Sequence, residues 1–297
     1  MSDSDARPRR SALYLPASNP RAIDKARSLP ADVVIFDLED AVAPGAKEQA
    51  RENLIQAFGQ GGFGARQLVI RVNHIETPYF EADLDLVARC QPAAILVPKV
   101  SDVESLARIA SRIAARSFPR MPALWAMIET ARGLVRLGEI VAPLPDGLPR
   151  LDCLVVGTND IARETRVSMA DGRACMLPWL MALVLAAREQ GLSVLDGVWN
   201  DFRDIAGYER ELEQSRRMGF DGKTLIHPSQ IEGANAAFGP SADEVAEARQ
   251  IVEAFAQPEH AGAGVINLDG RMVELLHLEM AQRTLQMDGA IRRLAGG

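Results

Sequence analysis

The chain has 297 residues, 47% of them apolar and 25% charged, which is typical of a globular protein with one large domain or two ordinary ones. Its 40 acidic residues exceed its 33 lysines and arginines, and the net charge of −7 argues against a nucleic-acid partner, because phosphate binding needs a basic surface. The three cysteines are far apart and form neither a metal-binding nor a disulfide pattern, which indicates a reducing compartment, and we expect the cytoplasm.

The sequence predicts no membrane contact. Residues 1–10 are polar and end in basic residues, so we expect a disordered lead, and no apolar signal core follows it. The longest apolar stretch, Ala174 to Ala187, contains Pro178 and is shorter than the roughly 18 residues that a membrane span needs. We expect a buried helix at this stretch.

Short apolar segments alternate with helical patterns from residue 11 to about residue 235. Eight segments have the character of buried strands: 12–15, 33–36, 68–72, 94–97, 123–128, 153–156, 193–195 and 224–226. Helical patterns occupy residues 20–28, 47–58, 78–90, 102–116, 131–141, 176–190 and 204–218. Because strands that alternate with helices pair in parallel, eight such units predict an α/β fold, a TIM (β/α)8 barrel.

A doubly wound sheet with a dinucleotide site is the alternative fold. The run from Gly59 to Gly64 matches the pattern G-x-G-x-x-G. However, it follows a helical pattern and precedes a strand, which reverses the strand–turn–helix order that the motif requires. We expect a flexible turn at this run.

The alternation of strands and helices ends after residue 228. One amphipathic helix is predicted over residues 242–255 and a second over 272–285. We therefore expect residues 11–235 to form the catalytic barrel. Residues 236–297 are expected to form additional C-terminal helices that cap the barrel or contact a neighbouring subunit.

Polar residues follow the predicted strands, at the end of the barrel where catalytic groups lie. They are Pro16 to Asn19, Asp37 to Asp40, Arg71, Asn73, Lys99, Glu129, Gly157 to Asp160, Asp196 and His227. A single one, such as Glu129 after the apolar strand 123–128, is also explained as a helix cap. Charged groups at six strand ends would converge on one mouth, which predicts an active site. We expect His227, which precedes Pro228, to stabilise a turn instead.

Carboxylates outnumber cations at this predicted mouth, where Arg71 and Lys99 face Asp37, Glu39, Asp40, Glu129, Asp160 and Asp196. Crowded carboxylates repel one another unless a cation joins them. Oxygen ligands without a cluster of cysteine or histidine favour Mg²⁺, with Mn²⁺ as the second choice. The acidic cluster Asp37, Glu39 and Asp40 has two possible roles, as direct ligands or as helix caps and hydrogen-bond partners behind the ligands.

Six motifs then occur in order, and together they are recognisable. They are Ser11 to Ala17, Asp37 to Val42 with Lys47, Arg71 to Asn73, Pro98 to Val100, Ile128 to Thr130, and Gly219 to Pro228. From about residue 10 to 285 the chain resembles the HpcH/HpaI aldolase and citrate lyase β-subunit superfamily, in particular its CitE-like CoA-ester lyases. The resemblance implies a TIM barrel, Mg²⁺, and a homotrimer or hexamer.

The resemblance also implies roles for individual residues. Glu129 and Asp160 match the metal ligands, and Arg71 matches the arginine that binds substrate oxygen. Relatives carry an aspartate near the C-terminus that enters the site of a neighbouring subunit as an acid or base. The matching residue here is Glu274, and the alternative is that it is only an acid in the first turn of a helix.

Further substrate contacts are expected from the chemistry. Backbone amides at Gly157 and Thr158 are suited to a substrate carboxylate if a helix begins there. Lys99, with Arg21 and Lys25, is a candidate for the phosphates of CoA. The metal is expected to chelate a 2-oxo acid while Arg71 stabilises an oxyanion.

The main interpretation is a Mg²⁺-dependent carbon–carbon lyase. It would cleave or form a 3-hydroxyacyl-CoA such as malyl-CoA, citramalyl-CoA or citryl-CoA, with an acyl-CoA and a 2-oxo acid as the other reactants. Residues 161–164 depart from the small and acidic residues usual in the family, so the substrate stays open. The alternatives are a free 2-oxo-acid aldolase or an acyl-CoA thioesterase on the same barrel. A catalytically silent CoA-ester-binding regulator is a further alternative, against which the intact site residues argue.

Overall fold

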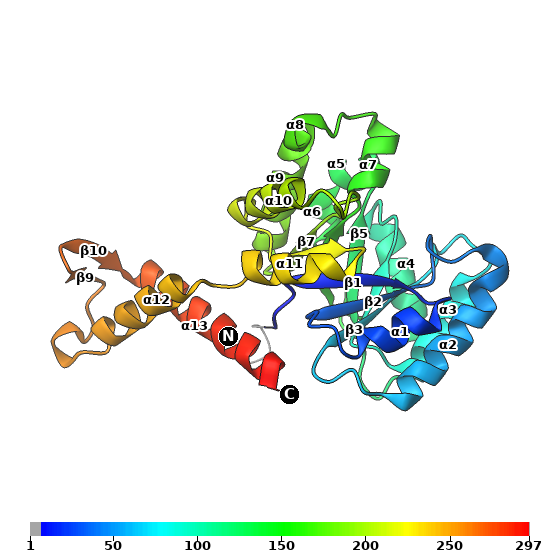
Figure 1. Ribbon diagram of the computed structural model, residues 1–297, viewed down its shortest axis with the longest axis horizontal. Helices are drawn as coiled ribbons and strands as arrows, with labels where there is room; N and C mark the ends of the chain where they lie inside the picture. The colour runs from blue at the N-terminus through cyan, green and yellow to red at the C-terminus, as the bar shows by residue number, and fades with distance from the viewer. Residues whose placement is uncertain (1–6, 297) are drawn as a thin grey trace. The chain divides into compact units, whose positions relative to one another are not determined.

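The computed structural model describes residues 7–296, which divide into two compact units, Arg9–Ala237 and a C-terminal unit that starts at Phe238. The first unit is a closed barrel of eight parallel strands that follow one another in chain order (Figure 1). The strands are β1 Ser11–Pro16, β2 Val33–Asp37, β3 Gln67–Arg71, β4 Ala94–Val97, β5 Ala123–Ile128, β6 Leu151–Val156, β7 Ser193–Asp196 and β8 Gly222–Leu225. The predicted TIM barrel is confirmed, and the doubly wound sheet is wrong, because the barrel closes by pairing β1 with β8.

Helices connect the strands and cover the barrel (Figure 1). They are α1 Pro20–Ala26, α2 Lys47–Gln60, α3 Phe80–Cys90, α4 Val103–Ala114, α5 Ala131–Val135, α6 Leu137–Ile140, α7 Thr158–Thr165, α8 Ala170–Arg173, α9 Leu177–Glu189, α10 Ile205–Met218 and α11 Ile231–Phe238. Single turns of 3₁₀ helix are η1 Pro44–Ala46, η2 Ala174–Met176 and η3 Pro228–Gln230. Of the run from Gly59 to Gly64, where we expected a turn, Gly59 and Gln60 are instead the last residues of α2, and the rest connects this helix to β3, with φ of 64° at Gly61 and 84° at Gly62.

The eighth strand starts earlier than the sequence suggested, at Gly222 instead of Thr224. Glycine and lysine are not typical strand residues, which hid this start. Gly222 lies against the backbone of Arg9, where an added Cβ would be 1.9 Å from the carbonyl oxygen. Close approach of two backbones therefore requires glycine at this strand.

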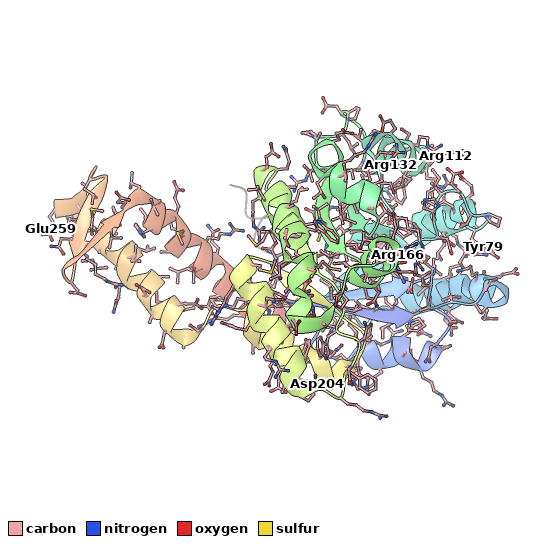
Figure 2. The ribbon with its side chains drawn as sticks, turned by 90° about the horizontal axis from the view of Figure 1, so that it is seen from above. Tyr79, Arg112, Arg132, Arg166, Asp204 and Glu259 are labelled. Carbon is pink, nitrogen blue, oxygen red and sulfur yellow. The ribbon has the colours of Figure 1, made fainter. Side chains whose placement is uncertain are left out.

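Side-chain caps determine where several outer helices begin. Asn19, Asp102, Thr130 and Asp204 each accept a hydrogen bond from a first-turn amide, of α1, α4, α5 and α10 respectively (Asp204 is labelled in Figure 2). Thr130 directly follows Glu129, so the cap of α5 also restrains the backbone next to this glutamate.

Alternate residues of the strands fill the barrel interior. This core consists of Ala12, Val33, Ile35, Val69, Ala94, Leu96, Trp125, Met127, Cys153, Val155 and Leu195. Because strand side chains alternate between the two faces, the next residue of the same parity also points inward. Asp37, Arg71 and Glu129 follow interior residues by two positions and face the mouth. Asp196 follows interior Leu195 by one position and faces the outer helices.

The start of the chain takes part in the fold before residue 11. Arg9 is buried and forms an ion pair with Asp152 at the start of β6. Arg10 forms two bonds of 2.8 Å with Asp32. The expected disordered lead is therefore wrong for these two arginines, because their ion pairs with Asp152 and Asp32 hold them in the fold. Residues 1–6 of this lead lie outside the described part of the chain.

The long apolar stretch from Ala174 to Ala187 forms η2 and most of α9, and the buried helix predicted there is present. By length and composition alone, residues 170–189 could cross a membrane. In the fold, however, α9 buries Leu180 and Leu183 and packs against β6 and β7. The left-handed backbone of Asp171 and Gly172 also interrupts the helix before α9 begins. These contacts support a covering helix of the barrel.

The C-terminal unit contains α12 Ala242–Phe255, the turn η4 Pro258–His260, strands β9 Val265–Leu268 and β10 Arg271–Glu274, and α13 Leu275–Gly296. α12 and α13 pack together, and β9 and β10 form an antiparallel hairpin. The predicted helix start at residue 272 is wrong, because residues 271–274 pair with β9 around a turn at Asp269 and Gly270. Both turn residues have positive φ, 52° and 79°.

Candidate active site

A cavity of about 340 Å³ lies at the carboxyl ends of the strands. One part of its lining is polar and comes from Asp37, Asp40, Arg71 and Asp160. Another part is apolar and comes from Met127, Val156, Val198 and Ile226. Tyr14, Ala41, Gly157, Thr158, Asn159 and Thr224 complete it. A concave site with a few convergent polar groups on an apolar wall is typical of a small-molecule site.

Arg71 and Asp37 form a buried pair at this cavity. Asp37 accepts a bond of 2.7 Å from Nε of Arg71 and one of 2.6 Å from Nη2. This bidentate geometry holds the guanidinium plane in one orientation. Asp37 also accepts the backbone N–H groups of Glu39 and Ala41, at 2.8 and 3.0 Å. With four such bonds, Asp37 serves as the hydrogen-bond partner that positions Arg71, the second of its two possible roles.

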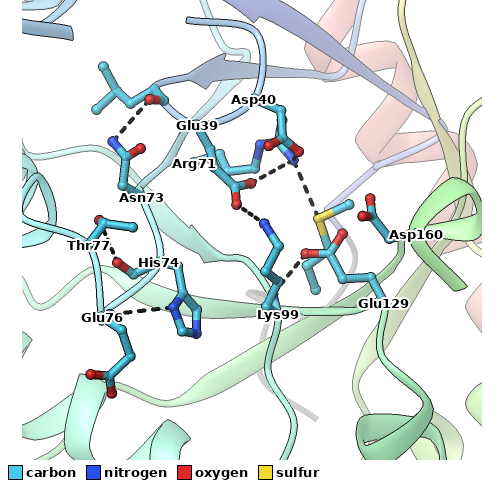
Figure 3. Close-up of polar contacts among 12 residues, drawn as sticks. Glu39, Asp40, Arg71, Asn73, His74, Glu76, Thr77, Lys99, Glu129 and Asp160 are labelled. Carbon is cyan, nitrogen blue, oxygen red and sulfur yellow. Dashed lines mark hydrogen bonds and ion pairs between the residues drawn. The ribbon is translucent and has the colours of Figure 1, made fainter. Parts of the chain in front are cut away.

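Glu39 lies between the two cations of the mouth. Its Oε1 pairs with the ammonium of Lys99, and its Oε2 is 3.1 Å from Nη1 of Arg71 (Figure 3). Burial raises the pKa of Glu39, while Arg71 and Lys99 act against this rise. Asp40 is 61% exposed and 3.8 Å from Arg71. The excess of free carboxylates expected at the mouth is thus smaller than the sequence suggested.

Glu129 follows β5 and is 1% exposed. Its Oε1 accepts the backbone N–H of Lys99 at 2.8 Å, and Lys99 has a left-handed φ of 54° that turns this amide toward it. Its Oε2 is buried and has no hydrogen-bond partner among the described residues. Burial, followed by the charges of Glu39 and Asp160, raises the pKa of Glu129 to about 8. Glu129 is therefore a buried carboxylate that keeps one oxygen without a hydrogen-bond partner in the described part of the chain, although it does not itself belong to the cavity lining.

Asp160 stands in the first turn of α7 and lines the cavity. Its carboxylate is 21% exposed and pairs with Arg163 at 2.5 Å. The close approach of Glu129 to the start of α7 depends on Gly157, where an added Cβ would lie 2.4 Å from Cβ and 2.6 Å from Oε2 of Glu129. Figure 3 shows Glu129 and Asp160 beside Lys99 and Arg71.

The predicted anion site at the start of α7 is present only in part. The helix does begin at Thr158, as that prediction required. The amide of Gly157 donates to the carbonyl of Ile128 at 3.1 Å, so this amide is already bonded, although Gly157 itself lines the cavity. The hydroxyl of Thr158 is buried without a hydrogen-bond partner in the described part of the chain. Thr158 therefore stays a candidate.

Glu129 and Asp160 suit a divalent cation. A buried carboxylate oxygen without a partner, close to a second carboxylate, is relieved of repulsion when a cation binds. Mg²⁺ typically takes one or two protein carboxylates and completes its shell with water and substrate. Residues 7–296 contain no group of three histidine, cysteine, aspartate or glutamate side chains placed to hold one metal ion. Water or substrate would therefore supply the other ligands of an ion bound by Glu129 and Asp160. The residues present fit such an ion.

Asp196 does not belong to the mouth, contrary to the sequence prediction. It pairs with Arg173 and Lys223 at 2.8 Å and accepts a bond of 2.6 Å from Ser215. Burial opposes its ionisation, but Lys223 and Arg173 outweigh this and hold the pKa of Asp196 well below its ordinary value. The sequence showed neither cation as a partner, because Arg173 is distant in the chain and Lys223 lies within a strand.

His227 stabilises the turn that the sequence predicted. Its ring nitrogen Nδ1 accepts the N–H of Ser229 at 3.2 Å, and the backbone N–H of His227 donates to Oε1 of Gln230 at 3.1 Å. Tyr14 is the residue that sequence reasoning missed. It belongs to a recognised motif but received no role, although its place two positions after interior Ala12 pointed it toward the cavity.

The remaining predicted residue, Glu274, is the last residue of β10 in the C-terminal unit. Its backbone N–H donates to Nδ1 of His277 at 3.0 Å. Because α13 begins at Leu275, Glu274 precedes the first helical turn. Its action in a neighbouring subunit stays a prediction.

A closed parallel barrel with an anchored arginine and two carboxylates at its mouth has the architecture of a (β/α)8-barrel enzyme. Residues 10–228 match the family described as HpcH/HpaI aldolase/citrate lyase, and the chain belongs to this family. The predicted family is thereby confirmed.

Three relatives define the comparison further. A (3S)-malyl-CoA thioesterase of Cereibacter sphaeroides strain KD131 is 46% identical over 286 residues, which cover 96% of this chain and 96% of the relative. An L-malyl-CoA/beta-methylmalyl-CoA lyase of Cereibacter sphaeroides strain ATCC 17025 is 33% identical over 93% of each chain. The crystal structure of CitE from Mycobacterium tuberculosis with magnesium, acetoacetate and coenzyme A has a TM-score of 0.74 at 28% identity, covering 97% of this chain and 100% of that chain.

These relatives correct the expected reaction. Four (3S)-malyl-CoA thioesterases are 43–46% identical to the chain, whereas the malyl-CoA lyases are 32–33% identical. The carbon–carbon lyase is therefore wrong as the main interpretation, and the thioesterase alternative is the better supported one. The motifs did not separate the two reactions, because both would act on one thioester at one set of strand ends. The expected magnesium is the ion present in the CitE crystal structure.

Proposed function

We propose that this protein is a Mg²⁺-dependent thioesterase that hydrolyses a malyl-CoA-type thioester to the free hydroxy acid and CoA. The observation that carries the proposal is the 46% identity to a (3S)-malyl-CoA thioesterase over 96% of both chains. The cavity at the strand ends supports it, since the site offers both a pair of carboxylates and an anchored guanidinium.

Glu129 and Asp160 would hold the ion, through the unpartnered Oε2 of Glu129 and the partly exposed carboxylate of Asp160. Bound there, Mg²⁺ would supply Lewis-acid polarisation and a template for the oxygens of the acyl group. Its charge would also favour the ionised form of Glu129, whose pKa is otherwise raised to about 8 by burial and by nearby carboxylates.

Arg71 would bind a substrate oxygen. Asp37 orients its guanidinium, so little conformational freedom is lost when substrate binds. The buried hydroxyl of Thr158 is suited to the substrate carboxylate at the start of α7. Lys99 would contribute positive charge near the CoA phosphates, although Glu39 already pairs with it.

The direct test is a product assay with purified protein, Mg²⁺ and (3S)-malyl-CoA. Hydrolysis releases one free thiol and one malate for each thioester consumed, and a thiol reagent and chromatography measure these two products. Carbon–carbon cleavage would instead give acetyl-CoA and glyoxylate without free thiol, and that result would overturn the proposal. A matched reaction in EDTA should lose turnover.

The assembly and location remain part of the proposal. Exposed apolar side chains of the C-terminal unit support a homo-oligomer, trimer or hexamer, since Met272, Leu276 and Met280 are 70%, 51% and 64% exposed. In such an assembly, the C-terminal unit would place Glu274 in the active site of a neighbouring subunit. We expect the assembly to be located in the cytoplasm. Mixing inactive Glu129→Ala and Glu274→Ala proteins under subunit exchange should restore part of the activity, and a mixture that forms hybrid oligomers without activity would contradict a shared site.

A further inference from the structure

Two hydrogen-bond donors in the cavity converge on one sulfur atom. The hydroxyl of Tyr14 lies 3.9 Å from Sδ of Met127, and Nη1 of Arg71 lies 3.7 Å from the same sulfur. Figure 3 shows the contact between Arg71 and this sulfur. All three residues line the cavity at the strand ends.

Neither donor is well satisfied by this contact, because a thioether sulfur is only a weak acceptor. Within residues 7–296 the Tyr14 hydroxyl has no hydrogen bond to an oxygen or nitrogen acceptor. Arg71 uses Nε and Nη2 on Asp37, which leaves Nη1 with an ion-pair contact to Glu39 at 3.1 Å. Two polar donors that share a weak acceptor in a cavity mark a place where a stronger acceptor can bind.

We propose that Tyr14 is a catalytic residue, whose hydroxyl and Nη1 of Arg71 together bind the thioester carbonyl oxygen near the position of the Met127 sulfur. The inference rests on the proposed thioesterase function and names a donor for its reaction. Methionine is flexible enough to move from this position when substrate enters.

The donor pair fits the charge that hydrolysis creates. Water adds to the thioester carbonyl carbon, a C–O bond forms, and the carbonyl π electrons move to the oxygen. The proton of the water passes to a carboxylate of the cavity, of which Asp40 is 61% exposed and in contact with solvent. Collapse of the tetrahedral intermediate then breaks the C–S bond, and the thiolate of CoA leaves and is protonated by solvent. The oxyanion is the species that Tyr14 and Arg71 stabilise by hydrogen bonds.

Tyr14 is suited to donate throughout this reaction. Burial raises the pKa of its phenol, an effect that the Arg71 charge opposes and nearby carboxylates reinforce, so the hydroxyl keeps its proton at neutral pH. The guanidinium of Arg71 lies 5.0 Å from the centre of the Tyr14 ring. This stacking depends on the ring and not on the hydroxyl, which allows the two contributions to be separated by mutation.

Tyr14→Phe removes only the hydroxyl and is the decisive variant. In the free-thiol assay we expect kcat to fall about 100-fold, KM to rise about 3- to 10-fold and Tm to stay unchanged, because the donor binds the carbonyl oxygen of the substrate and binds the developing oxyanion more strongly. Tyr79→Phe is the matched control, since Tyr79 (labelled in Figure 2) contacts Lys47 with its ring and is absent from the cavity lining. A Tyr14→Phe protein with kcat within 3-fold of wild type would overturn the inference.

A binding measurement separates this inference from the proposed function. The probe is malyl-CoA in which a methylene group replaces the thioester sulfur, so the carbonyl remains but hydrolysis cannot occur. Calorimetry with Mg²⁺ should give weaker binding by about 3- to 10-fold for Tyr14→Phe than for wild type and Tyr79→Phe. If wild type releases no thiol from malyl-CoA, the thioesterase proposal fails while this titration still decides the role of Tyr14. Equal binding by all three proteins, or no binding at all, would overturn that role.

Discussion

Two regions of the barrel place carboxylates next to cations, with opposite consequences. On β2 and β3, Asp37 and Arg71 face the cavity. On β7 and β8, Asp196 and Lys223 face the outer helices and are completely buried. In both strand pairs the carboxylate and the cation occupy directly opposite positions, Asp37 opposite Arg71 and Asp196 opposite Lys223. The two ion pairs differ because strand side chains alternate between the inner and the outer face of the barrel. Asp37 and Arg71 occupy inward-facing positions at the cavity, whereas Asp196 and Lys223 occupy outward-facing positions under the helices.

The two regions also differ in how completely their carboxylate oxygens are hydrogen-bonded. Every oxygen of the Asp196 carboxylate is bonded, one to Arg173 and the other to Lys223 and Ser215. Beside the cavity, Oε2 of Glu129 is buried without a hydrogen-bond partner among the described residues, and Oε2 of Glu39 has only its ion-pair contact with Arg71. A fully bonded buried network contributes to specifying the fold, whereas unsatisfied carboxylates cost stability and mark a site that awaits a ligand.

The largest effect is expected at Glu129. Glu129→Gln keeps the shape of the side chain but removes the charge, so we expect Mg²⁺ affinity to fall and turnover to fall by about 1,000-fold or more, with the fold retained. Thiol release and magnesium calorimetry measure the two effects. Glu139→Gln, at a residue that is 57% exposed, is the control. Wild-type turnover by Glu129→Gln would remove Glu129 from the metal site.

The second effect tests the other region. Asp196→Ala leaves Lys223 and Arg173 buried with only Glu211 as a carboxylate partner, and we expect the free energy of unfolding to fall by about 3–5 kcal/mol. Urea unfolding measures this loss, while kcat of the protein that remains folded should stay within about 3-fold of wild type. Normal stability with lost turnover would place Asp196 in the active site after all.

The third prediction concerns pH in the metal-free protein. Glu129 has an ordinary pKa of 4.5 and a pKa of about 8 in the fold, so the folded state binds its proton more tightly than the unfolded chain. The contribution of Glu129 to stability is therefore highest below the ordinary pKa, falls as the pH rises toward about 8, and is lowest above it.

Across this range we expect the free energy of unfolding to lose on the order of a few kcal/mol from this residue. Urea unfolding in EDTA at several pH values measures the trend. Comparison with Glu129→Gln isolates the contribution of Glu129, since other carboxylates titrate in both proteins. Identical pH slopes for the two proteins would show that its pKa is not raised.

The smallest effect is expected for Arg71→Lys. Lysine keeps the charge but loses the planar pair of bonds to Asp37, so we expect kcat/KM to fall by about 10- to 100-fold and Tm to fall by a few degrees. Arg112→Lys is the control, because Arg112 is 61% exposed and pairs with Glu81 on the surface. A loss of Tm without a loss of kcat/KM would make Arg71 purely structural.

Hydrophobic patterning was enough to predict the barrel and the strand ends that carry its chemistry. Apolar runs such as 123–128 are too short and too uniformly apolar for amphipathic helices, so their alternation with helical patterns indicates parallel strands. The same alternation carries the parity that points Glu129 and Arg71 inward and Asp196 outward. The sequence therefore already indicated that Asp196 faces outward. It was wrongly assigned to the mouth because that prediction considered only which charged residues follow the strands.

Only the tertiary structure decided which charges neutralise one another. Arg173 lies 23 positions before Asp196 and Arg71 lies 34 positions after Asp37, and no local pattern couples such distant residues. The hairpin of β9 and β10 was also not predicted. Each of its strands has only four residues, and the helical pattern that begins at residue 272 overlaps β10. Similarly, the convergence of Tyr14 and Arg71 on Met127 depends on how three strands meet in space, since side chains 56 and 113 positions apart become neighbours only when the barrel closes.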